Sequence, residues 1–422
     1  MKIKALATAA LFALLAGTSS EAATIKLECF ASSGGKAFCN YVKERFERET
    51  GNTLETVEFP TSSDERLSLF QQIFASKDGS VVDVFNIDIV WLGLLDKHLA
   101  DLTDNFKDLE PKIFPAAWQN NVVNGRLKGI PELVDAGVMY YRTDLLEKYG
   151  EKPPATWGDM ARIAKRIQDS ERAAGNTKIN GLVFQGKAYE GLTCDALEWV
   201  AAYNGGTFVD ADGKITVNNP KAAKALDVAA SWVGTISPQG VLGYTEEEAR
   251  AVFQNGDAVF MRNWPYAYLL TQDDTSPVKG KVGIMPLPKG GEDGQNAATL
   301  GGWQWGVSNY SQNKNEAFKL VRILVSEEAQ KKAFMLMGQS PTLMSLYSDP
   351  EILAKSPTLT QMKTVFDSAI ARPSTPTKRQ FPAVSKAIFN AAYDVLSKRT
   401  DGTQAVADLE GKLKRLKGAE WK

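Results

Sequence analysis

The chain has 422 residues, with 49 lysines and arginines against 50 aspartates and glutamates. This near balance argues against a protein that binds nucleic acid or anionic lipid through a basic surface. The single histidine, His98, argues against a histidine-based metal site and against a Ser-His-Asp triad. We expect His98 to be a surface residue at a helix end, and we expect neither a metal nor a cofactor.

Residues 1–22 have the three parts of a secretory signal peptide. Lys2 and Lys4 are positively charged, residues 5–16 are apolar, and small residues before Ala23 suit cleavage. The apolar run is too short to span a bilayer; a buried N-terminal helix is the alternative. Because no cysteine follows the run, a lipoprotein is not expected. The sequence therefore predicts a soluble periplasmic protein that begins near Ala23.

The mature chain has about 400 residues, more than one hydrophobic core accommodates, so we expect two domains. It begins with alternating strands and helices. Strands are expected at 24–30, 53–59 and 81–87, and helices at 37–50 and 64–75. This order is typical of an open α/β sheet, in which ligands bind beyond the carboxyl ends of the strands.

The α/β alternation continues through the middle of the chain. We expect an extended crossover at 129–142, helices at 143–149, 157–170, 190–203 and 222–233, and strands at 180–185, 283–288 and 304–308. Thr245 opens a capping box, and glutamates 246–248 are expected to form the solvated first turn of its helix. From Asn313 onward the pattern is mostly helical.

Two of the three cysteines lie close together near the mature N-terminus. Cys29 and Cys39 are ten residues apart, and secretion would allow a disulfide between them. Two free thiols are the alternative. We expect Cys194 to be buried and inert, since a free cysteine packs as a small hydrophobic residue.

Charged residues at strand ends and in loops are candidates for binding a sugar. Asp88 follows a buried strand, and Asp135 interrupts an apolar stretch. Carboxylates make charge-assisted hydrogen bonds to hydroxyl groups, and so do guanidinium groups such as those of Arg66 and Arg372. The plainer interpretation is that the aspartates cap helices or form turns and that Arg66 is a solvated helix charge.

Aromatic residues in rigid loops offer flat surfaces to the apolar faces of sugar rings. Pro265 separates Trp264 from Tyr266 and would direct both rings to one place, although Trp264 would also fit in a core. Trp303 follows two glycines, which let a ligand approach the backbone closely. Neither a P-loop nor a G-x-S-x-G elbow occurs in the sequence.

Several segments together resemble the extracellular solute-binding proteins of the maltose-binding class, in particular trehalose/maltose-binding proteins of ABC importers. They span nearly all of the mature chain and lie at 85–93, 135–150, 189–192, 253–266, 276–283 and 298–303. The resemblance implies an α/β periplasmic-binding-protein fold, with two lobes, a hinge and a ligand cleft between the lobes. The implied lobes are 23–134 plus 302–345 and 135–301 plus 346–422.

The same resemblance implies a function. The protein would capture a small glycoside, such as a trehalose/maltose-like disaccharide, and deliver it unchanged to the permease of an ABC transporter in the inner membrane. We expect a monomer without catalytic residues. The implied ligand contacts are Arg66, Asp88, Asp135, Glu190, Gly191, Trp264, Tyr266, Gly301, Gly302, Trp303 and Arg372.

One subsite departs from the trehalose/maltose pattern. The first loop, 32–36, lacks an acidic residue, and Leu133 stands where the pattern has a tyrosine. An unpaired polar group in a buried site costs about 1–3 kcal/mol, enough to change ligand preference. The serines, glycines and Lys36 of this loop suit a smaller or anionic aglycone, as in glucosylglycerol or sulfoquinovosyl glycerol.

A secreted glycosidase that uses Asp88 and Asp135 as its carboxylate pair is the competing hypothesis. The arginines expected near these carboxylates would keep them ionised instead of raising a pKa for general-acid catalysis. The sequence therefore favours binding over hydrolysis. A docking role at a chemoreceptor is compatible with binding.

Overall fold

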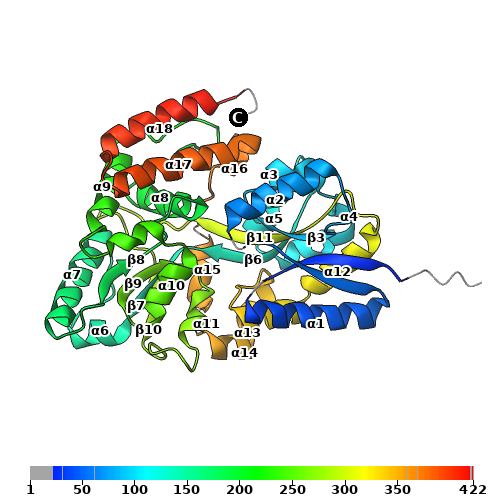
Figure 1. Ribbon diagram of the computed structural model, residues 1–422, viewed down its shortest axis with the longest axis horizontal. Coiled ribbons are helices and arrows are strands. Elements are labelled where there is room, and N and C mark those ends of the chain that lie inside the picture. Colours follow the sequence, from blue (N-terminus) through cyan, green and yellow to red (C-terminus); the bar gives the residue numbers. More distant parts are fainter. Residues whose placement is uncertain are drawn as a thin grey trace, which may run out of the picture.

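The computed structural model describes residues 22–30, 32–60, 62–357, 359–367, 369–418 and 421. The expected signal peptide lies outside these residues, apart from Ala22. Two sheets, each covered by helices, form two lobes side by side (Figure 1). Within the described residues, no helix combines the length and the apolar character that a membrane span requires.

The first lobe contains a five-stranded sheet in the order β2-β1-β3-β11-β6. Its strands are β1 (Thr24–Cys29), β2 (Thr53–Glu58), β3 (Val84–Asp88), β6 (Ile130–Ala136) and β11 (Leu300–Val307). β1, β2 and β3 are parallel, and β11 runs antiparallel to both β3 and β6. The carboxyl ends of β3 and β6 therefore meet at one edge of the sheet, where β11 begins.

Helices surround this sheet on both faces (Figure 1). They are α1 (Ser33–Thr50), α2 (Ser63–Ser76), α3 (Leu92–Leu95), α4 (Thr103–Phe106), α5 (Pro115–Asn120), α12 (Lys314–Leu324), α13 (Glu327–Met337) and α14 (Pro350–Lys355). A short hairpin of β4 (Val122–Val123) and β5 (Arg126–Leu127) follows α5. The apolar faces of α1 and α2 bury Phe46, Phe70 and Phe74 against the sheet.

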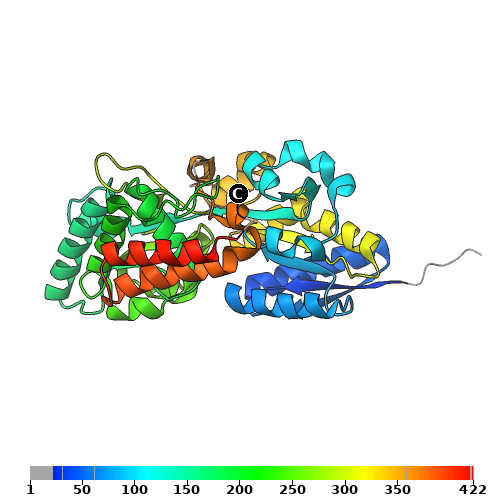
Figure 2. The same ribbon diagram turned by 90° about the horizontal axis from the view of Figure 1, so that it is seen from above.

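The second lobe contains a four-stranded sheet in the order β10-β7-β9-β8. Its strands are β7 (Val138–Arg142), β8 (Asn180–Val183), β9 (Ala258–Asn263) and β10 (Val282–Pro286). Its helices are α6 (Thr143–Lys148), α7 (Trp157–Ala173), α8 (Glu190–Ala202), α9 (Pro220–Trp232), α10 (Glu246–Gln254), α11 (Ala267–Thr271), α16 (Ser374–Thr377), α17 (Phe381–Leu396) and α18 (Gly402–Leu416). Figure 2 shows α17 and α18 side by side along this lobe.

The chain crosses between the lobes in extended segments. Gly137 alone separates β6 of the first lobe from β7 of the second. The return crossing leads through Thr299, which bridges to Ile370, into β11. α15 (Leu359–Asp367) packs against strands of both lobes, β6 and β10. Asp135 and Gly302, where we predicted lobe boundaries, lie two and three residues from these crossings, inside β6 and β11 of the first sheet. The division of the chain into lobes, with its further boundary after residue 345, stays a prediction.

The start of the first helix differs from the prediction. α1 begins at Ser33, so most of the expected loop at 32–36 is its first turn. Ser32 caps the helix by accepting a hydrogen bond from the Gly35 backbone N–H. The structure joins Cys29 to Cys39 of this helix by a disulfide, whereas Cys194 is free and buried, as expected.

His98 is not a freely solvated surface residue. Its ring is half-buried and stacks on Phe74, with ring centroids 5.1 Å apart. Its Nδ1 lies 2.8 Å from the Tyr310 hydroxyl. Burial lowers the pKa of His98, and the nearby Lys77 and Lys97 lower it further.

Candidate functional site

Arg372 lies between the two lobes and pairs with a carboxylate from each. Its Nη2 is 3.1 Å from Asp88 Oδ1 at the end of β3, and its Nη1 is 2.8 Å from Glu190 Oε1 at the start of α8. All three side chains are buried, and Ser385 also donates to Glu190. Burial raises the pKa of Glu190 to about 7, against the opposing charge of Arg372. The ion pairs of Arg372 thus link a first-lobe strand to a second-lobe helix.

Asp135 and the glycines before Trp303 face each other where the lobes meet. Asp135 is opposite Gly301 in the β6–β11 pairing, and Trp303 is opposite both Asp88 and Leu133. Burial raises the pKa of Asp135 to about 8, and the charge of Arg262 only partly opposes this. The expectation that arginines would keep both aspartates ionised is therefore wrong for Asp135.

Two of the predicted glycines, one in β11 and one in α8, occupy positions where a side chain would clash with neighbouring atoms. Gly302 has φ 145°, a conformation that side chains rarely adopt, and a Cβ there would lie 2.8 Å from the Leu133 carbonyl oxygen. A Cβ on Gly191 would overlap the ring of Tyr189. Gly302 therefore allows β11 to approach β6, and Gly191 leaves room for the Tyr189 ring.

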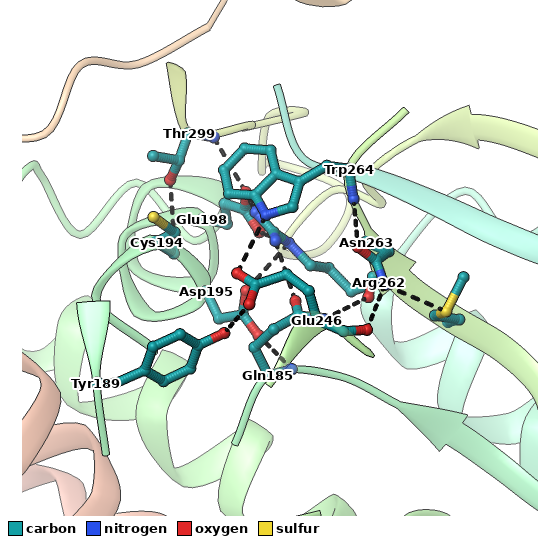
Figure 3. Close-up of polar contacts among 11 residues, drawn as sticks. Gln185, Tyr189, Cys194, Asp195, Glu198, Glu246, Arg262, Asn263, Trp264 and Thr299 are labelled. Atoms are coloured by element: carbon teal, nitrogen blue, oxygen red, sulfur yellow. Dashed lines mark hydrogen bonds and ion pairs between the residues drawn. The ribbon is translucent and has the colours of Figure 1, made fainter. Parts of the chain in front are cut away.

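The aromatic loop after β9 is held by the first turn of α10. The Tyr266 hydroxyl donates to Glu247 at 2.5 Å, and Trp264 Nε1 donates to Glu246 at 3.4 Å. Glu246 also accepts a 2.6 Å hydrogen bond from the Tyr189 hydroxyl (Figure 3). The prediction that the glutamates at 246–248 are simply solvated is wrong for Glu246, because α10 begins against this loop.

Arg66 lies inside the first lobe and is not a solvated helix charge. Its guanidinium carbon is 4.6 Å from the centroid of the Trp303 ring, a cation–π distance. Its Nε is 3.1 Å from the Pro60 carbonyl oxygen and 3.4 Å from Glu28 Oε1. The side chain is 11% exposed. Arg66 and Trp303 therefore form one unit beside the edge that carries Asp88.

The sequence did not single out the acidic residues behind this unit. Glu28 accepts a 2.8 Å hydrogen bond from the Asn86 backbone N–H, and the Asn86 side chain donates to Glu132. Burial raises the pKa of Glu28 to about 7 and that of Glu132 to about 8. In the sequence, the signal that could have revealed Glu28 and Glu132 was the presence of a charged residue inside an otherwise apolar strand.

A second group of residues that the sequence did not reveal lies under Trp264. Arg262, on β9, stacks on the Trp264 ring and pairs with Asp195 and Glu198 of α8 (Figure 3). The side chains of this ion cluster are 0–1% exposed. As with Glu28 and Glu132, the available sequence signal was a charged residue within a buried helix or strand.

The structure thus brings most of the predicted residues together. Asp88, Glu190 and Arg372 are in contact, Trp303 stacks with Arg66, and Gly301 adjoins both Asp135 and Trp264. Tyr266 and Gly191 have other neighbours: the Tyr266 hydroxyl donates to Glu247, and Gly191 lies against the ring of Tyr189. Carboxylates, guanidinium groups and indole rings from both lobes form a site suited to a ligand with hydroxyl groups and apolar faces.

Residues 31–331 match the bacterial extracellular solute-binding protein family. A probable ABC transporter-binding protein of Deinococcus radiodurans is 46% identical over 411 residues, which cover 97% of each chain. The solved structure of maltose-bound T. maritima MalE3 is 35% identical and has a TM-score of 0.88, covering 94% of this chain and 100% of that one.

An ABC transporter solute-binding protein of Agrobacterium radiobacter K84, solved with ribitol, has the same fold. It is 24% identical with a TM-score of 0.82, and the match covers 94% of this chain and 99% of that one. The family match at residues 31–331 contains strands of both sheets, from β2 to β11. The chain therefore belongs to the bacterial extracellular solute-binding protein family and is a solute-binding protein of an ABC transporter.

Proposed function

We propose that this protein binds a small glycoside between its lobes in the periplasm and delivers it, unchanged, to the permease of an ABC transporter. The bridge from Asp88 through Arg372 to Glu190 carries the proposal. A ligand that replaces or joins these ion pairs would contact both lobes at once. Such a ligand would shift the equilibrium toward the closed arrangement, which the permease would recognise.

The chemistry of the site favours a neutral disaccharide of the trehalose/maltose type. Asp88 and Asp135 would bind hydroxyl groups, and a protonated Asp135 can donate a hydrogen bond as well as accept one. Trp264 and Trp303 offer indole faces to the sugar rings. The maltose-bound T. maritima protein, 35% identical to this chain, supports the same class of ligand.

An anionic aglycone, as in sulfoquinovosyl glycerol, is the second candidate ligand, and its support depends on Lys36. The Lys36 Nζ lies 3.0 Å from Glu58 Oε1. Since this exposed pair reduces the positive charge available to an anion, the structure favours a neutral glycoside. A Lys36→Gln variant would separate the two: it should leave maltose affinity unchanged and lower affinity only for a sulfonated ligand.

Isothermal titration tests the proposal with mature protein that has been unfolded and refolded to remove bound sugar. The panel is trehalose, maltose, sucrose, glucosylglycerol and sulfoquinovosyl glycerol. We expect one-to-one binding of a disaccharide and no release of product from a chromogenic glycoside. Binding of the glycerol or sulfonated glycosides alone would reassign the ligand. Hydrolysis, or no heat with any ligand, would overturn the proposal.

A further inference from the structure

The ion cluster beneath Trp264 contains one guanidinium group and two carboxylates in the interior of the second lobe. Arg262 Nε is 3.0 Å from Asp195 Oδ1, and Arg262 Nη2 is 2.5 Å from Glu198 Oε1. Gln185 accepts a further 3.0 Å hydrogen bond from Arg262 Nη1. A buried ion cluster is often no more stabilising than apolar residues of the same volume.

One set of contacts fixes the ring of Trp264. The guanidinium carbon of Arg262 is 4.2 Å from the ring centroid (Figure 3). A Cβ on Gly301 would be 2.9 Å from Cζ3 of the same ring, and the indole N–H donates to Glu246. The ring thus has Arg262 over one face and two further neighbours, Gly301 and Glu246.

A second set of contacts ties the same cluster to the crossings between the lobes. Glu198 Oε1 accepts a 3.1 Å hydrogen bond from the Thr299 backbone N–H, just before β11. Thr299 Oγ1 donates to the Cys194 carbonyl oxygen at 2.9 Å. At the other crossing, a Cβ on Gly137 would overlap Glu198 Oε1 and lie 2.5 Å from Arg262 Nη2. The crossings at Gly137 and Thr299 therefore both contact the Arg262–Glu198 pair.

We propose that Arg262 is a positioning residue for ligand binding, which holds the Trp264 ring in a fixed relation to the crossings at Gly137 and Thr299. Asp195 and Glu198 orient the guanidinium, and the guanidinium orients the ring. A change in either crossing would then change the placement of the ring. The effect on sugar affinity rests on the proposed function, whereas the placement of the ring does not.

Fluorine NMR of the mature protein labelled with 5-fluorotryptophan tests the placement without a ligand. A Trp264→Phe variant assigns the Trp264 resonance. We expect this resonance to shift or broaden in Arg262→Lys and Glu198→Gln, because a lysine or an amide cannot reproduce the charged, forked pair. The decisive variant is Gly137→Ala, which adds one methyl group at a crossing, and it should also move the Trp264 resonance.

Two matched controls separate this role from general destabilisation. Arg142→Lys alters another buried arginine of the same sheet, which pairs with Asp144. Gly158→Ala adds a methyl group where the nearest atom would be 3.6 Å away. Neither control should move the Trp264 resonance. An unmoved resonance in both Arg262→Lys and Gly137→Ala, with the fold retained by circular dichroism, would overturn the proposal.

A double-mutant cycle by calorimetry tests the consequence for binding, with maltose and trehalose as probes. Arg262→Lys should lower affinity about tenfold or more, a loss of about 1.4 kcal/mol. In a Trp264→Ala background the same substitution should cost little further affinity. Additive losses would contradict an effect that acts through the ring. If the unsubstituted protein bound neither sugar, the trehalose/maltose-type ligand of the proposed function would be ruled out, and the fluorine spectra would still decide the placement.

Discussion

Gly301 lies directly against the ring of Trp264: a Cβ on this glycine would be 2.9 Å from Trp264 Cζ3 and 3.2 Å from the Asp135 Cβ. A Gly301→Ala substitution must therefore displace the ring or the strand. Overpacking of this kind lowers the stability of the fold by about 1–3 kcal/mol. Because the displaced ring belongs to the proposed ligand contacts, we also expect sugar affinity to fall about tenfold or more in calorimetry. Gly158→Ala is the control, and equal affinities for both variants would contradict the prediction.

Arg372 supplies the positive charge between two buried carboxylates. An Arg372→Met substitution would leave Asp88 and Glu190 without it, and breaking a buried pair in this way costs about 3–5 kcal/mol. We expect a marked fall in the free energy of unfolding, measured in urea, and loss of sugar binding. The matched control is Arg399→Met. Arg399 forms a 3.1 Å pair with Asp394 in which the side chains are 65% and 36% exposed, so its loss should cost less than about 1 kcal/mol.

Local patterns were sufficient to predict the α/β alternation and the position of Asp88 at the end of a strand. Apolar runs and capping residues are properties of neighbouring positions, so α7 was found with its correct first residue and α10 with its capping box. The start of α1 was missed because the serines and glycines at 32–35 have low helix propensity. A contact distant in sequence accompanies its first turn, where Gly34 packs against the backbone of Leu336. The disulfide between Cys39 and Cys29 then joins the following turn to β1.

The interior charges could not be placed from local patterns. α8 is buried along its whole length, so Asp195 and Glu198 lie on no polar face that periodicity would reveal. Their partner Arg262 is more than sixty residues away in sequence and is brought to them by the packing of β9 beside α8. The resemblance to known binding proteins implied a set of candidate ligand contacts, but it did not name the charged residues that support Trp264.

The disulfide gives a prediction about stability. Closing a loop of ten residues stabilises a fold by about 2–3 kcal/mol, chiefly by restricting the unfolded chain. We expect the free energy of unfolding of a Cys29→Ala/Cys39→Ala double variant to be lower by that amount, so that the variant unfolds at a lower urea concentration. Thiol alkylation of the unfolded parent protein should label one cysteine without reductant and three with it. Equal labelling under both conditions would contradict the disulfide.

Glu132 gives a prediction about pH. It lies near Glu28 and Arg66, and burial raises its pKa from 4.5 to about 8 in the folded protein. Between these two values the folded state holds the proton more tightly than the unfolded state, so raising the pH through this window lowers stability. A Glu132→Gln variant carries no ionisable group there and retains an oxygen that can accept from Asn86. Relative to the parent protein, we expect the variant to gain stability steadily from about pH 4.5 to about pH 8.

Urea unfolding at intervals across this window measures the difference between Glu132→Gln and the parent protein. The control is Glu110→Gln, at a position that is exposed. Its difference from the parent should stay nearly constant across this window, because the exposed Glu110 side chain remains in contact with water in the folded protein. The sign is decisive. If Glu132→Gln lost stability relative to the parent as the pH rose, Glu132 would be ionised in the folded protein, and Arg66 would then outweigh its burial.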